Sequence, residues 1–307
     1  MIFGDDVFPG PHVSIYTAGH PLSAEVRNLE LEYARAVKIG DSVWIGAGVT
    51  VLPGVTIGNN AVIGAGNMVN REIPDGVVAA GNPCRVIRRI TDADRENTKF
   101  GIARRCIMTE REKMLSGEWY DTSDPWLVSQ RNIARDVSEQ YNRTSESEIE
   151  MRRSILKGLL GSIGEYTEIY PTVKFDYGCN TYIGARCYIN FNAVFLDCAE
   201  IRLGNDVFVG PNVSFLTPIH PLLAKERNVR MAPDGHHYMI ETCRPITVEN
   251  NVWLGGDVTI LPGVTIGHDS VIGAGSVVTK SIPPEVVAAG NPCKVIRKIT
   301  ENDANNI

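Results

Sequence analysis

Two histidines stand at matching places in this chain, each followed by proline in a loop. His220 lies in the run Thr-Pro-Ile-His-Pro, and His20 lies in Thr-Ala-Gly-His-Pro. A glutamate follows each at the far side of the same loop, Glu241 and Glu32 respectively. Imidazole exchanges a proton near neutral pH and a carboxylate can orient it, so each pair could act as a general base. A His-Pro in a loop is more often structural than catalytic, and the residues alone leave both roles open.

The other histidines and the cysteines do not form a metal-binding pattern. Of the six histidines only His236 and His237 are adjacent, and neither has partners at a repeat spacing. A metal-dependent hydratase would need three histidines converging on zinc. The seven cysteines are odd in number and include no Cys-x-x-Cys pair, which favours free buried thiols over a zinc or disulfide framework. We therefore expect no metal.

The matching histidines belong to an internal duplication. Residues 1–96 align as an amino-truncated copy of 201–305, and the run Val51–Gly58 repeats as Ile260–Gly267. The second copy carries nine extra residues within 231–242, a polar stretch punctuated by Gly and Pro that is typical of a loop. The repeats are therefore the framework, and the insertion is a loop attached to it.

An aliphatic residue returns at every sixth position in both copies. The series are Ile39, Ile45, Val51, Ile57, Ile63 and Val69, then Val248, Leu254, Ile260, Ile266, Ile272 and Val278. Neither the helix period nor the strand period produces this spacing. It is typical of a parallel β-helix, in which three hexamers make one coil and stacked coils share backbone hydrogen bonds. The residue four places after each aliphatic, such as Val43 after Ile39, should also face the coil interior.

Between the two repeat regions the pattern becomes helical. Glycine is scarce from Thr109 to Leu160, charged residues dominate, and Ser145 with Glu148 resembles a capping box. We predict a truncated repeat segment at 1–90, a linker at 91–107, a helical cap at 108–160 and a complete repeat domain at 161–307.

Composition excludes several classes of protein. With 43% hydrophobic and 21% charged residues over 307 positions, the chain has material for about two folded domains. No apolar run approaches the ~20 residues that span a bilayer, and we expect a cytoplasmic protein without a membrane partner. The net charge of −6 argues against a nucleic-acid partner.

Several stretches carry a resemblance to a known enzyme family. They are 108–120 (Met-Thr-Glu-Arg-Glu-Lys-Met-Leu-Ser-Gly-Glu-Trp-Tyr), Asn190-Phe191-Asn192, His220-Pro221-Leu222, 251–256 (Asn-Val-Trp-Leu-Gly-Gly) and 289–296 (Ala-Gly-Asn-Pro-Cys-Lys-Val-Ile). From Met108 to Asp303 the chain resembles the maltose and galactoside O-acetyltransferases of the hexapeptide-repeat class. The resemblance implies a mostly β fold, a left-handed parallel β-helix with a small helical cap, here joined to a partial duplicate. It also implies acetyl-CoA as cosubstrate, a sugar-like small-molecule acceptor, and a homotrimer with sites at subunit interfaces.

The resemblance also implies roles for individual residues. His220 matches the family's catalytic histidine, and Glu241 would orient it. The acceptor contacts it implies are Asp121, Asn190 and Asp197. The coenzyme contacts it implies are Trp253, Gly256, Thr279, Lys280, Lys294 and Arg297. Because Asp176 replaces a serine of the galactoside members, the acceptor could be maltose, glucose, a galactoside or a non-sugar hydroxyl compound.

The amino-terminal copy keeps only part of this set. It retains His20, Glu32 and Trp44, but it begins after the counterparts of the acceptor contacts Asn190 and Asp197. We predict a truncated copy with a vestigial site. A noncatalytic β-helix scaffold is the alternative for this segment.

Overall fold

The computed structural model describes residues 1–304 apart from 92, 95–107 and 233. The chain divides into two compact units. Unit 1 comprises Met1–Asn97 together with Leu222–Asn228, and unit 2 comprises Thr98–Pro221 and Val229–Ile307. The grouping of Leu222–Asn228 with unit 1 differs from our sequence-based division, which assigned those residues to the second repeat domain. The predicted linker at 91–107 lies almost entirely outside the described residues.

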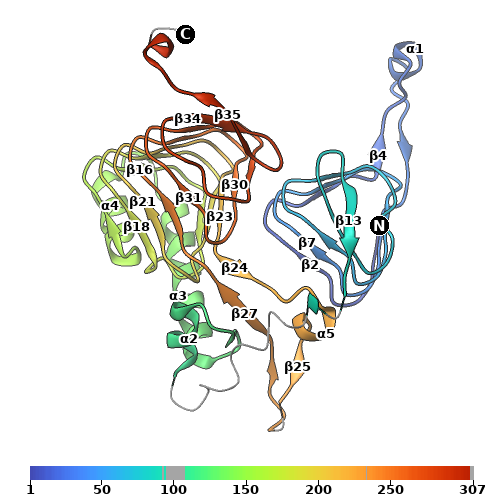
Figure 1. Ribbon diagram of the computed structural model, residues 1–307, viewed down its shortest axis with the longest axis horizontal. Helices are drawn as coiled ribbons and strands as arrows, with labels where there is room; N and C mark the ends of the chain where they lie inside the picture. The colour runs from blue at the N-terminus through green and yellow to red at the C-terminus, as the bar shows by residue number, and fades with distance from the viewer. Residues whose placement is uncertain (92, 95–107, 233, 305–307) are drawn as a thin grey trace. The chain divides into compact units, whose positions relative to one another are not determined.

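Unit 2 is a coil of short strands whose three faces are parallel sheets (Figure 1). The first sheet contains β15 (Ser162–Ile163), β18 (Thr181–Ile183), β21 (Ile201–Leu203), β28 (Ile246–Val248) and β31 (Thr265–Ile266). The second contains β16 (Glu168–Ile169), β19 (Tyr188–Ile189), β22 (Phe208–Val209), β29 (Trp253–Leu254), β32 (Val271–Ile272), β34 (Val286–Ala289) and the antiparallel β35 (Lys294–Lys298). The third contains β17 (Val173–Phe175), β20 (Ala193–Leu196), β23 (Ser214–Leu216), β30 (Thr259–Ile260) and β33 (Val277–Val278).

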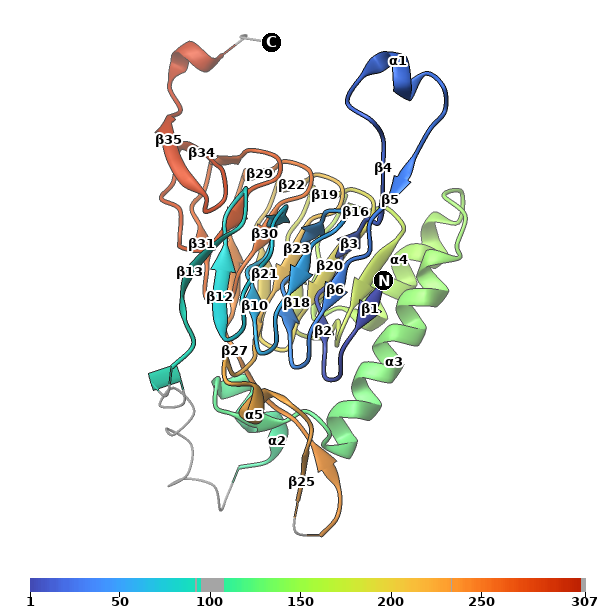
Figure 2. The same cartoon turned by 90° about the vertical axis from the view of Figure 1, so that its right-hand side faces the viewer.

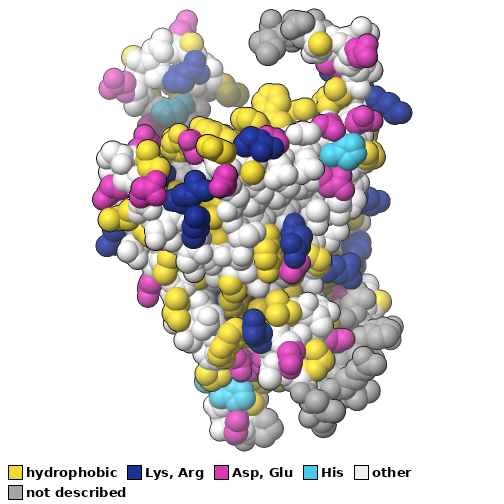
Figure 3. Space-filling view, turned by 90° about the vertical axis from the view of Figure 1, so that its left-hand side faces the viewer, with side chains coloured by type: hydrophobic (Ala, Val, Ile, Leu, Met, Phe, Trp, Pro, Cys, Tyr) yellow, Lys and Arg dark blue, Asp and Glu magenta, His cyan; other side chains and the backbone are white. Residues whose placement is uncertain are grey.

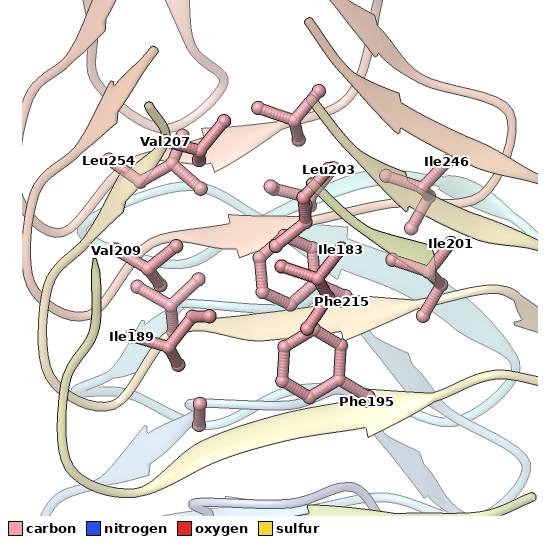
Figure 4. Close-up of a cluster of buried hydrophobic side chains, with 14 of the residues drawn as sticks. Ile183, Ile189, Phe195, Ile201, Leu203, Val207, Val209, Phe215, Ile246 and Leu254 are labelled. Atoms are coloured by element: carbon pink, nitrogen blue, oxygen red, sulfur yellow. The ribbon is translucent and has the colours of Figure 1, made fainter. Parts of the chain in front are cut away.

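The aliphatic residues of successive hexamers stack inside this coil (Figure 4). Leu254 stands in register with Val209 below it and Ile272 above it, and all three are buried. On the third sheet Phe195 and Phe215 stack with ring centroids 4.7 Å apart. Most strands place at least one side chain inside, whereas the last strand, β35, is exposed along its whole length. The core is continuous through the stack, so stability is shared between neighbouring coils.

The helical cap consists of α2 (Glu110–Ser116), α3 (Pro125–Asn142) and α4 (Ile149–Leu159). Tyr141 and Leu156 join the hydrophobic core of the coil, so the apolar faces of α3 and α4 cover its first turns (Figure 2). The predicted capping box at Ser145 is only half formed, since Glu148 accepts from the Ser145 N–H while the Ser145 side chain makes no return cap. A complete capping box stands instead at Thr109, before α2. Among the described residues, no helix has the length and apolarity that crossing a membrane requires.

Unit 1 repeats the coil on a smaller scale. Its sheets are β1 (Ile2–Phe3), β6 (Lys38–Ile39) and β9 (Thr56–Ile57); β2 (Phe8–Pro9), β7 (Trp44–Ile45), β10 (Val62–Ile63), β12 (Val77–Ala80) and β13 (Arg85–Arg89); and β3 (Ser14–Ile15), β8 (Thr50–Val51) and β11 (Met68–Val69). Val43 and Val49 are fully buried, as the hexamer pattern predicts. At the first coil, by contrast, Ile2 and Phe3 remain 56% and 45% exposed.

Candidate active site

A small antiparallel sheet outside the coil of unit 2 carries the predicted histidine. It joins β24 (Pro218–Ile219), β27 (Ile240–Cys243) and β14 (Tyr120–Asp121). Ile219 lies opposite Thr242, so His220 and Glu241 follow as neighbours across the two strands. Tyr120, from the cap, lies directly opposite Glu241. Three segments far apart in the sequence therefore meet at one point.

The carboxylate of Glu241 lies between Tyr120 and His220, and the Cys198 thiol also donates to its Oε1 at 3.6 Å. One oxygen, Oε1, accepts a hydrogen bond from the Tyr120 hydroxyl. The other, Oε2, lies 3.7 Å from Nδ1 of His220. Burial, and then the neighbouring Glu241 carboxylate, raise the pKa of Tyr120 well above its ordinary value, so the hydroxyl stays protonated as a donor. The Tyr120 contact therefore fixes the carboxylate in position beside the imidazole.

This geometry assigns different tasks to the two ring nitrogens of His220. With Nδ1 toward the carboxylate, Nε2 is the nitrogen that can accept a proton from another molecule. The imidazole is 33% exposed whereas the Glu241 side chain is 10% exposed, so a substrate can reach the base but not its orienting partner. A histidine positioned in this way can act as a general base. Sequence reasoning paired His220 with Glu241 but missed Tyr120, which lies 121 residues from its partner.

The same histidine–glutamate pair recurs in unit 1 with less support. His20 follows β4 (Ala18–Gly19), Glu32 precedes β5 (Tyr33–Ala34), and these strands form a two-stranded sheet. The distance from His20 Nε2 to Glu32 Oε1 is 3.6 Å, but the two side chains are 57% and 60% exposed. The carboxylate here faces the other ring nitrogen and is largely solvated. The pair is therefore less well positioned for proton transfer than its counterpart in unit 2.

Asp121 borders a pocket of about 220 Å³ beside β14. The pocket is lined by Glu110, Lys113, Trp119, Tyr120, Asp121, Ala232, His236, Tyr238 and Ile240. Four of these residues belong to the insertion at 231–242. The insertion contributes to a hairpin of β25 (Arg230–Met231) and β26 (His237–Tyr238). His236 Nε2 lies 3.5 Å from Asp121 Oδ2, and its pKa is raised first by Asp234 and then by Asp121. The sequence predicts the insertion as a loop, but it does not predict that His236 of this loop lies beside Asp121.

The two other predicted acceptor contacts lie in the coil. Asn190, half-buried after β19, accepts at Oδ1 from the N–H of Phe191. Asp197 follows β20 and is completely buried. Its oxygens accept from the Tyr177 N–H at 2.8 Å and the Thr181 hydroxyl at 3.0 Å. In this structure Asp197 therefore holds neighbouring coil turns together, and its contact with an acceptor stays a prediction.

Asp197→Asn is expected to flatten the dependence of unfolding free energy on pH between about 4 and 6. Burial raises the pKa of Asp197 from 3.8 to about 6, so the folded chain binds this proton more tightly than the unfolded chain. The stabilisation is complete below about pH 4 and is lost as the pH rises through about 6, by roughly 3 kcal/mol. Asparagine has no such titration and can still bond to Tyr177 and Thr181. Urea unfolding of both proteins at pH 4 to 7 measures the difference, and equal slopes would contradict it.

Several predicted coenzyme contacts share the outer face of the second sheet of unit 2. Trp253 is in register with Val271, which is in register with Val287, which pairs with Arg297. Strands lie about 4.8 Å apart, so this row is about 14 Å long. Trp253 is 57% exposed and Lys294 is exposed on β35, the strand that also carries Arg297. An aromatic surface therefore leads along the sheet to basic groups.

The remaining coenzyme candidates differ in their surroundings. Thr279 and Lys280 are exposed immediately after β33. Both terminal nitrogens of Arg297 donate hydrogen bonds to the carboxylate of Asp303, at 2.7 and 2.9 Å. Asp303 lies in the short helix η2 (Glu301–Asp303), so the Arg297 charge is already paired within the chain.

The glycine pair after β29 has one obligatory member. A side chain at Gly255 would lie 2.7 Å from the Ala274 backbone, whereas one at Gly256 would meet only ordinary contacts with Pro211. Gly255 therefore allows the close approach of two coils, and the predicted role of Gly256 depends on its backbone N–H.

On the face drawn in Figure 3, basic and acidic side chains are intermixed rather than gathered into one basic patch. In the part of the chain that the structure describes, no three His, Cys, Asp or Glu side chains are grouped to hold a metal ion.

The pattern described as "Maltose acetyltransferase hexapeptide capping motif" matches residues 113–164, and "Bacterial transferase hexapeptide (six repeats)" matches 36–71 and 245–280. The galactoside O-acetyltransferase of Escherichia coli is 40% identical over 196 residues, which are 64% of this chain and 92% of that protein. The chain belongs to the maltose and galactoside O-acetyltransferase family.

Solved structures of the family agree with the fold. A maltose O-acetyltransferase from Clostridium difficile matches with a TM-score of 0.59 and 45% identity, over 63% of this chain and 99% of that one. A galactoside acetyltransferase in complex with coenzyme A matches with a TM-score of 0.58 and 38% identity, over 64% of this chain and 94% of that one. The left-handed parallel β-helix is therefore confirmed, and the chain is an acetyltransferase.

Proposed function

We propose that this family member transfers the acetyl group of acetyl-CoA to a hydroxyl of a sugar-like acceptor, with His220 as the general base. The observation that carries the proposal is the contact chain from Tyr120 through Glu241 to His220. The relative whose structure holds coenzyme A supports the choice of donor.

The proposed acetyl transfer needs only the acceptor, acetyl-CoA and one proton shuttle, the imidazole of His220. Nε2 of His220 takes the acceptor proton as the hydroxyl oxygen attacks the thioester carbonyl carbon. The resulting tetrahedral intermediate collapses with cleavage of the carbon–sulfur bond, and the imidazolium returns the proton to the leaving thiolate. The products are an acetyl ester and free coenzyme A. A backbone N–H near Gly256 is our candidate for stabilising the oxyanion.

The pocket beside Asp121 supports a sugar-like acceptor. Asp121, Glu110 and His236 can hydrogen-bond hydroxyl groups, while Trp119 and Tyr238 offer apolar ring surfaces. Small-molecule sites combine apolar walls with a few such polar groups. A non-sugar hydroxyl compound of similar size is the alternative acceptor.

Thiol release from acetyl-CoA tests the proposal. The full chain is incubated with acetyl-CoA and a panel of maltose, glucose, galactosides and non-sugar alcohols, and ester formation is confirmed by mass. We expect release that depends on both enzyme and acceptor, with a sugar preferred. A protein-only blank is needed because Cys179 is exposed and can react with the thiol reagent. Absence of acceptor-dependent release across the panel would contradict the proposed function.

Cytoplasmic location and assembly are further parts of the proposal. Buried free thiols at Cys187, Cys198 and Cys243 are compatible with a reducing compartment. The homotrimer with sites at subunit interfaces stays a prediction, and the mass of the assayed species by light scattering tests it.

A further inference from the structure

The segment Leu222–Asn228 packs on a corner of the coil in unit 1, and we call it the seated strap. It contains the four-residue helix α5 (Ala224–Arg227). Arg227 is only 1% exposed. One terminal nitrogen donates to the backbone oxygen of Leu222 and the other to that of Ser42, each at 2.8 Å. Asn228 donates to Asp6 Oδ2 and to the Ser42 hydroxyl, both at 3.0 Å.

The receiving surface, which we call the unit 1 corner, consists of Asp6 and Ser42. Both residues have positive φ, 54° and 57°, where the coil turns. The N–H of Ser42 donates to the carbonyl of Asp5 in the adjoining coil at 2.7 Å, so the corner is held by the stack itself. Burying a guanidinium is costly unless it is hydrogen-bonded. The corner supplies one acceptor, the Ser42 carbonyl, in a fixed geometry, and the strap supplies the other from Leu222.

The chain carries a second strap of the same kind, Leu22–Asn28, which we call the exposed strap. It contains α1 (Ala24–Arg27) and ends in the same Arg-Asn pair. Arg27 donates to the carbonyls of Pro21 and Leu22, each at 3.2 Å, much as Arg227 donates to Leu222. Leu22, however, is 98% exposed and Arg27 is exposed as well. The segment has the local fold of the seated strap without its burial.

Unit 2 carries a second corner of the same kind. Asp206 and Asn251 are the sequence counterparts of Asp6 and Ser42, and their φ values are 57° and 58°. The N–H of Asn251 donates to Asn205 at 2.9 Å, which repeats the bond between Ser42 and Asp5. Asn251 is exposed, and the Asp206 side chain is 35% exposed although Arg186 pairs with it. We call Asp206 and Asn251 the unit 2 corner.

We propose that the exposed strap of one chain docks on the unit 2 corner of a second copy of this chain. Arg27 then donates to the backbone oxygen of Asn251, and Asn28 donates to Asp206, as their counterparts do in unit 1. Leu22 becomes partly buried in the contact, as Leu222 is in the seated strap, and this adds a hydrophobic contribution. The interface is heterologous, so repeated contacts close a ring or extend a filament. It involves none of the chemistry proposed above, and its failure would leave that chemistry unaffected.

Photo-crosslinking of the full chain tests the contact. A benzophenone amino acid replaces Leu22, and ¹⁵N-labelled and unlabelled chains are mixed at low concentration, concentrated and irradiated. We expect crosslinks that join a labelled to an unlabelled chain and that map to peptides containing Asp206 or Asn251. Crosslinks confined to single chains, crosslinks that map elsewhere, or a monomer without crosslinks would each overturn the proposal.

A charge reversal supplies the quantitative arm of the test. Arg27→Glu places a carboxylate against the Asn251 carbonyl and next to Asp206, and we expect at least a tenfold rise in the dissociation constant measured by analytical ultracentrifugation. Arg71→Glu, at an exposed position of the same unit outside the strap, is the matched control and should leave association unchanged. Circular dichroism establishes that both variants are folded. Equal dissociation constants for the two folded variants would contradict the docking contact.

Discussion

His220→Ala is expected to lower the rate of acetyl transfer by about 10²- to 10⁴-fold, the range in which a positioned general base contributes. The side chain that would accept the hydroxyl proton is removed, while Glu241 keeps its hydrogen bond from Tyr120 and the surrounding sheet remains. The loss should appear in kcat with little change in the KM for acetyl-CoA, because the imidazole acts on the reacting proton rather than on the coenzyme. Steady-state thiol release with the preferred acceptor measures both constants.

A matched substitution separates this chemistry from a general effect of losing an imidazole. His268 is also partly exposed and also lies beside a carboxylate, with Nδ1 2.7 Å from Asp269, but it stands at a coil corner outside the proposed site. His268→Ala should retain the wild-type kcat within about twofold. A folded His220→Ala protein that loses less than threefold in kcat would exclude His220 as the base.

Phe215→Ala should produce the largest loss of stability, about 3–5 kcal/mol. Phe215 is fully buried and stacks on Phe195 at 4.7 Å, and Phe195 stacks in turn on Phe175 at 5.0 Å. Removing the Phe215 ring leaves a cavity inside the narrow coil. The adjacent strands β20 and β30 are held in register with β23, so they cannot close around this cavity. Calorimetry should show the unfolding transition of unit 2 lowered by roughly 6–20 °C.

An exposed phenylalanine in the same unit provides the comparison. Phe208 is 53% exposed and stacks loosely on Tyr188, with ring centroids 6.3 Å apart. Phe208→Ala should change stability by no more than about 0.5 kcal/mol, as is usual for surface positions. Similar losses of unfolding free energy for Phe208→Ala and Phe215→Ala would mean that the stacked interior rings do not contribute the expected stability to the coil.

The coil could be predicted from sequence because its rule is local. Each hexamer places its aliphatic residue inside regardless of distant partners, so Leu254 and Ile272 could be assigned to the core from spacing alone. The general base candidate follows from a different local signal, the short motifs around His220 that carry the family resemblance.

The features that sequence reasoning missed all depend on contacts between distant segments. The burial of Asp197 depends on Tyr177 and Thr181, which approach it from other turns of the coil. The hydroxyl of Tyr120 reaches Glu241 because β14 of the cap pairs with β27. No period or motif encodes such pairings, and a carboxylate in a family motif looks the same in sequence whether it is exposed or buried.

The uncovered first turn of unit 1 has a consequence for handling the protein. In unit 2 the helices α3 and α4 seal the corresponding end, whereas Ile2 and Phe3 lie open to solvent. A bare end face presents the apolar groups and unpaired peptide groups on which any extended polypeptide can add as one more layer. Concentrated preparations are therefore expected to lose material through end-on stacking, and a charged residue in place of Phe3 would be the simplest remedy.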